Sequence, residues 1–95
     1  MPSLTIIAKV QARPGHAETL LAAQQQLVVE TLQEKGCLKY ELHRSNEREG
    51  LVIFVESWET HADWQAHMTG EAMQRFQRSA GELIADAVID QLTPV

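Results

Sequence analysis

The stretch LVIFVESWE, residues 51–59, decides the fold class of this 95-residue chain. It opens with five consecutive apolar residues, so a strand here would present hydrophobic side chains on both of its faces. A strand with one face in water would instead alternate apolar and polar residues. The stretch therefore predicts a strand of a sheet that is covered on both sides.

Two segments before this strand also have clear periodicity. Residues 4–12 are rich in β-branched and aliphatic side chains and stop at the turn sequence RPG, which predicts a strand. Residues 16–35 carry apolar side chains at spacings of three, four and seven, which is typical of an amphipathic helix. Gly36 can adopt the left-handed conformation that ends such a helix.

The rest of the chain completes an α+β pattern. CLKYELHRS, residues 37–45, alternates, with Leu38, Tyr40 and Leu42 expected on the inner face of a strand. A helix is expected from His61 to about residue 80, with an interruption near Gly70. AVIDQL, residues 87–92, predicts a short last strand.

The resulting order, β-α-β-β-α-β, predicts one ferredoxin-like domain spanning residues 1–95. Such a domain places both helices on one face of an antiparallel sheet. The other face would then leave the apolar side chains of the strand at 51–55 in water, and such patches mark association sites. We therefore expect a homodimer whose two sheets face each other to form a dimeric α/β barrel.

Composition and charge exclude several classes of function. With 8 basic and 13 acidic residues and a net charge of −5, the chain is a poor partner for nucleic acid or an anionic membrane surface. It has no apolar run of the roughly 20 residues that span a bilayer, and no secretory signal is recognisable at its start. The lone Cys37 cannot form an internal disulfide, which favours the cytoplasm.

Histidine spacing argues against a metal site and leaves the role of one Asp–His pair open. His61 and His67 are six residues apart, so on a helix they point in different directions and cannot share an ion. No recognised metal-ligand spacing occurs elsewhere. Asp63 and His67 are four apart and can meet on one helix face, either as an oriented general base or as an ordinary surface pair.

Both tryptophans lie within the segment ESWETHADWQAHM, residues 56–68. Trp58 and Trp64 fit two interpretations equally well: core residues of a small domain, or the wall of a pocket for a flat apolar ligand. Adaptable side chains follow on the second helix. The candidate ligand-contacting residues are Tyr40, Trp58, Trp64, Met68, Met73 and Phe76.

Three segments, ARPGHAETL, EKGCLKYELHR and FVESWETHADWQAHM, together resemble the antibiotic biosynthesis monooxygenase family, in particular its small bacterial quinol monooxygenase-like members. The resemblance implies a ferredoxin-like dimer with a cleft between sheet and helices. It also implies oxidation of a quinol or polyphenol by O₂ without a metal or flavin cofactor, with His67 as the catalytic base. Relatives usually carry a second histidine where this chain has Ala72. A non-catalytic, small-molecule-binding or stress-associated dimer with the same cleft is the alternative.

Overall fold

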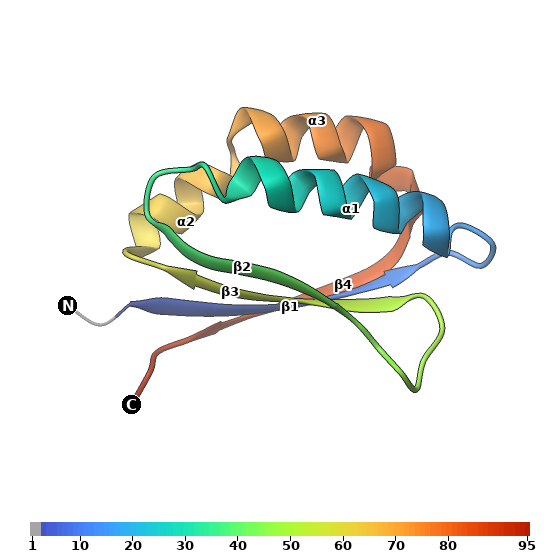
Figure 1. Cartoon of the computed structure of the whole chain (residues 1–95), viewed down its shortest axis with the longest axis horizontal. Coiled ribbons are helices and arrows are strands. Elements are labelled where there is room, and N and C mark those ends of the chain that lie inside the picture. The colour runs from blue at the N-terminus through green and yellow to red at the C-terminus, as the bar shows by residue number, and fades with distance from the viewer. Residues whose placement is uncertain (1–2) are drawn as a thin grey trace.

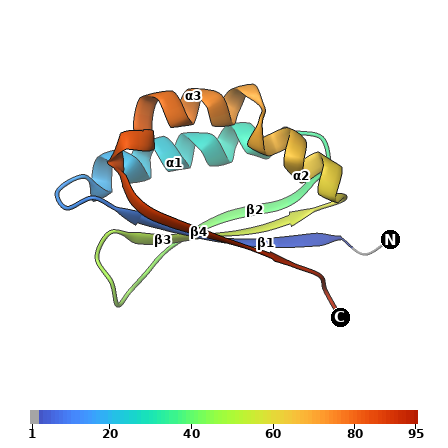
Figure 2. The same cartoon turned by 180° about the vertical axis from the view of Figure 1, so that it is seen from behind.

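The computed structural model describes residues 3–95, which form a four-stranded antiparallel sheet with its helices on one face (Figure 1). The strand order is β2-β3-β1-β4, and the view from behind shows the helices on the same side (Figure 2). This confirms the ferredoxin-like α+β fold. The elements are β1 (Leu4–Ala12), α1 (Ala17–Thr31), β2 (Cys37–Arg44), β3 (Leu51–Trp58), α2 (His61–Met68), α3 (Glu71–Ala80), a 3₁₀ turn (Gly81–Leu83) and β4 (Ile84–Leu92).

The predicted second helix is indeed interrupted near Gly70, where α2 ends and α3 begins. The start of α2 is fixed by a cap, because the Thr60 hydroxyl accepts a hydrogen bond from the backbone N–H of Asp63 at 3.0 Å. A β-carbon on Gly70 would lie 3.0 Å from the carbonyl oxygen of Ala66, so the tight connection that leaves the last turn of α2 suits a glycine. The break lets α2 and α3 follow different directions over the sheet (Figure 2).

The first helix is shorter than the predicted range of 16–35. It ends at Thr31, and from Gln33 the backbone N–H groups bond three residues back, with Glu34 N–H donating to the Thr31 carbonyl at 2.9 Å. These tighter turns lead to Gly36, whose φ of 79° is the left-handed conformation that favours glycine. The predicted range ran on to residue 35 because it was bounded by Gly36, and the polar residues 33–35 carry no apolar side chain that could mark the earlier end.

Two strand predictions need correction. Leu38 was expected on the inner face but is 58% exposed, because the pairing of β2 with β3 shifts register between Cys37 and Lys39 and takes Leu38 out of the alternation. The last strand begins three residues earlier than predicted, at Ile84, because its pairing with β1 extends to Ala12 across an irregularity.

The core lies between the sheet and the helices. Along β3, Val52, Phe54, Glu56 and Trp58 are buried against the helices, and the intervening residues are only half-buried on the opposite face. No helix of the described chain covers that opposite face (Figures 1 and 2). Because β3 is apolar on both faces, as predicted, hydrophobic side chains remain on the uncovered side of the sheet.

Candidate functional site

A cavity of about 90 Å³ lies between the sheet and the helices. Six of the seven residues predicted for the site line it, and Trp58 does not. The six are Tyr40, Trp64, His67, Met68, Met73 and Phe76. Most of the remaining lining is aliphatic and comes from β1, β4 and α1, so the cavity is a largely apolar space with a few polar groups.

His67 is the titratable residue of the cavity lining that contacts both Glu34 and Tyr40. It lies on the inward face of α2 and is 3% exposed. Its Nδ1 is 2.7 Å from Oε1 of Glu34, a residue of the connection between α1 and β2. Its Nε2 is 3.4 Å from the Tyr40 hydroxyl. Three segments distant in sequence thus meet at one imidazole.

The surroundings fix both the charge and the tautomer of His67. Burial lowers the pKa of the imidazole, and the hydrogen bond that His67 donates to Glu34 opposes that shift only in part. The ring is therefore neutral at neutral pH. Because Glu34 accepts a hydrogen bond from Nδ1–H, the proton of the neutral ring is on Nδ1 and the lone pair is on Nε2, beside the Tyr40 hydroxyl. A neutral imidazole with a free Nε2 can accept a proton from a ligand.

The Asp63–His67 pair considered from spacing does not form. Asp63 instead lies 3.4 Å from the Lys35 ammonium group, across the end of α2. The residue that orients His67 is Glu34, 33 positions away in sequence. Helical spacing predicted Asp63 as the partner of His67, and the structure pairs His67 with Glu34 instead, because that partner comes from a connection that folds back onto α2.

Trp58 is a core residue beneath the site. It is fully buried, and its ring centroid lies 4.9 Å from that of His67 at an interplanar angle of 30°. Its indole N–H donates to Oε1 of Glu56 at 2.9 Å. The indole ring thus packs against the imidazole. Trp58 does not line the cavity, so the structure places it behind His67 and not on the cavity wall where a ligand contact was predicted.

Two further buried polar residues of the cavity lining were not predicted. Glu56 is 4% exposed, and burial raises its pKa to about 7 despite the opposing hydrogen bond from Trp58. Gln24 on α1 is 1% exposed. Periodicity could have located both, because Glu56 alternates with Trp58 on β3 and Gln24 falls four residues after the buried Leu20. No comparable signal marked Glu34.

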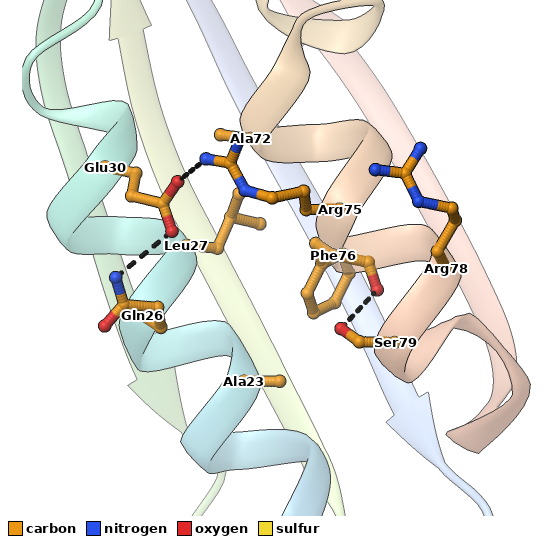
Figure 3. A pocket seen from close by; sticks show the side chains of 9 residues that line it. All are labelled: Ala23, Gln26, Leu27, Glu30, Ala72, Arg75, Phe76, Arg78 and Ser79. Atoms are coloured by element: carbon orange, nitrogen blue, oxygen red, sulfur yellow. Dashed lines mark hydrogen bonds and ion pairs between the residues drawn. The ribbon is translucent and has the colours of Figure 1, made fainter.

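A larger hollow of about 490 Å³ runs between α1 and α3 (Figure 3). It is an open groove, crossed by an ion pair between Arg75 and Glu30, and Arg78 lies along its rim. Its charged side chains are solvent-accessible and it contains no histidine. Ala72, where the family resemblance implies a second histidine, lines this groove and not the cavity. The smaller, buried cavity is therefore the better candidate for chemistry.

Within residues 3–95, no group of three or more histidine, cysteine or acidic side chains is arranged to hold a metal ion. Over the same range, no helix is both long and apolar enough to cross a membrane.

Comparison with known proteins places these features in context. The sequence model of the antibiotic biosynthesis monooxygenase family matches residues 3–79. The crystal structure of PA3566 from Pseudomonas aeruginosa has a TM-score of 0.94 and 36% identity, over 100% of this chain and 96% of that one. SO0527 from Shewanella oneidensis has a TM-score of 0.90 and 28% identity, over 98% and 91%. A crystal structure described as an antibiotic biosynthesis monooxygenase has a TM-score of 0.90 and 26% identity, over 97% and 98%. The comparison with curated proteins found no match.

Proposed function

Because the chain belongs to the antibiotic biosynthesis monooxygenase family, we propose that it is a cofactor-independent monooxygenase that oxidises a quinol or polyphenol with O₂. The observation that carries the proposal is the buried His67, whose Nδ1 is held by Glu34 and whose Nε2 faces the Tyr40 hydroxyl in a largely apolar cavity. A ligand hydroxyl near Nε2 would meet a base in the correct tautomer.

The proposed reaction balances without an external reductant. Nε2 of His67 removes a phenolic proton, and the electron-rich anion reduces O₂. One oxygen atom bonds to a ring carbon and the other leaves as water, which converts a quinol into a hydroxyquinone. The substrate gives up four electrons and O₂ accepts four, so the ligand supplies what a flavin or metal supplies in other oxygenases.

The Tyr40 hydroxyl would assist by remaining protonated. Burial raises its pKa well above the usual range, and the Glu56 carboxyl acts in the same direction. A protonated hydroxyl can donate a hydrogen bond to Nε2 before substrate binds and to the phenolate oxygen afterwards. The apolar lining would exclude water and strengthen these interactions.

The size of the cavity favours a small ring and mobile walls. A cavity of 150 Å³ is known to accommodate benzene, and the present one measures about 90 Å³. An aromatic ligand therefore requires side chains to move. Met68 and Met73 line the cavity, and their unbranched side chains can change rotamer at low cost.

We also propose that two chains associate through the uncovered face of the sheet. The half-buried Leu51, Ile53 and Val55 on β3 lie on that face, and Val88 of β4 and Leu92, both 47% exposed, extend the apolar surface. A specific interface buries at least roughly 1,200 Å². Light scattering at micromolar concentration should give twice the 10.7 kDa chain mass, whereas a stable, soluble monomer would contradict the barrel.

Oxygen uptake tests the proposed reaction. Metal-stripped protein should consume O₂ with at least one member of a panel of hydroquinones, naphthohydroquinones and catechols, beyond the rate of spontaneous oxidation. His67→Ala should lose nearly all of this excess uptake. The control His43→Ala changes an exposed histidine and should retain it. Saturable ligand binding without any O₂ uptake across the panel would favour the alternative, a non-catalytic binding protein.

A further inference from the structure

Gln24 is a buried polar side chain whose hydrogen-bonding groups are unused within the described chain. It lies on the inward stripe of α1 with Leu20, Leu27 and Thr31. Neither Oε1 nor Nε2 has a hydrogen-bond partner among residues 3–95. A buried amide without partners is less stable than a paired one, because it has lost its hydrogen bonds to water and gained none in return. Gln24 also lines the cavity, so a ligand there can reach it.

The fold separates Gln24 from His67. His67 is held by Glu34, beyond the C-terminal end of α1, while Gln24 lies seven residues before Thr31, the last residue of that helix. At 1.5 Å per residue, these seven residues correspond to about 10 Å along α1. The remaining polar side chains of the lining are Tyr40, Glu56 and Gln77, and Gln24 is the one whose buried amide has no partner among the described residues. A ligand could therefore meet His67 and Gln24 at two separate places.

We propose that Gln24 is a specificity-determining residue that binds the second oxygen of a para-dihydroxylated ring whose first hydroxyl faces His67. The two oxygens of such a ring lie at opposite ends, so each can form a hydrogen bond of about 2.8 Å with one of the two polar sites. The adjacent hydroxyls of a catechol reach only one site, and phenol has no second oxygen. Both would leave the Gln24 amide unpaired.

This inference rests on the proposed function only for the identity of the ring, and it makes a separate claim about binding. The Gln24 amide can accept from the ligand hydroxyl through Oε1 or donate to it through Nε2. A site that offers hydrogen bonds rejects ligands that cannot satisfy them, because its own buried groups then stay unpaired. We expect hydroquinone to bind roughly 10- to 100-fold more tightly than catechol or phenol.

Anaerobic calorimetry with hydroquinone, catechol and phenol tests the inference without oxidation. In the Gln24→Met variant, whose side chain has a similar length and no amide, the three affinities should converge within about threefold. The exposed neighbour Gln25 provides the matched control, and Gln25→Met should retain the preference of the wild type. Thermal unfolding of Gln24→Met should occur at the same temperature or higher, because the replaced amide has no partner to lose.

Several outcomes would overturn the inference. They are equal binding of the three ligands by the wild type, a preference that survives in both Gln24→Met and Gln24→Leu, or no detectable binding of hydroquinone at millimolar concentration. A marked loss of stability in both variants would assign Gln24 a structural role instead. Gln24-dependent preference without O₂ uptake would refute the oxygenase proposal and leave this inference standing.

Discussion

Replacing Glu56 by glutamine should change how stability depends on pH. The residue is 4% exposed on β3, and one carboxylate oxygen accepts the Trp58 indole N–H. Burial raises its pKa from the ordinary 4.5 to about 7. The folded protein therefore binds this proton more tightly than the unfolded chain does, and the stabilisation that results is fully present below pH 4.5.

That stabilisation is lost as the pH rises through about 7. The difference between 4.5 and about 7 corresponds to about 3 kcal/mol in the free energy of unfolding. Glutamine cannot ionise, and its amide oxygen can still accept the hydrogen bond from Trp58. Glu56→Gln should therefore match the wild type near pH 4.5 and exceed its stability by up to about 3 kcal/mol at pH 8.

Urea unfolding at pH 4.5, 6 and 8, followed by tryptophan fluorescence, measures this difference. His67 contributes with the opposite sign, since its lowered pKa favours the folded state above about pH 6.5, but it is common to both proteins and cancels in the comparison. The exposed Glu59→Gln provides the control and should follow the wild type. Parallel profiles for Glu56→Gln and wild type, or lower stability of the variant at pH 8, would refute the reasoning.

Four further predictions concern activity and ligand binding. His67→Ala should lower kcat about 10²- to 10⁴-fold in an oxygen-uptake assay while ligand affinity changes little, and equal kcat would exclude His67 as the base. In the wild type, activity should rise with pH through a midpoint below 6.5, because burial lowers the His67 pKa; a midpoint above 7 would contradict a neutral resting imidazole. Glu34→Gln removes the carboxylate that raises this pKa, so the midpoint of the pH–rate profile should move lower still and kcat should fall by about tenfold; an upward shift would exclude the pairing. Trp64→Ala removes part of the cavity wall and should weaken ligand binding, measured by calorimetry, more than it lowers kcat; the reverse pattern would place Trp64 in the chemistry.

Periodicity predicted most of the fold because the buried faces are regular. The order of elements, the extent of β1 and the break near Gly70 all follow from spacing of apolar residues and from glycine. The errors arose where the backbone departs from regular geometry. The tight turns after Thr31 shortened α1, and the irregular pairing near Cys37 exposed Leu38.

The site was only partly predictable, for a physical reason. Apolar and aromatic lining residues carry a periodic signal, and six of the seven candidates indeed surround one cavity. Polar contacts between distant segments carry none. Glu34 follows a helix end in a polar turn, and nothing in its neighbours indicates that the turn brings it within 2.7 Å of His67.

The proposed base, His67, depends on its contact with Glu34, which exists only while the α1–β2 connection is folded against α2. The two side chains come from the α1–β2 connection and from α2, both outside the sheet, and such peripheral segments are commonly the first to open in local unfolding. Opening that connection would break the hydrogen bond that fixes the tautomer of His67, while the strands remain paired. On gentle heating, activity should therefore decline before the global transition, and hydrogen exchange should be faster at residues 32–36 than along β1 and β3.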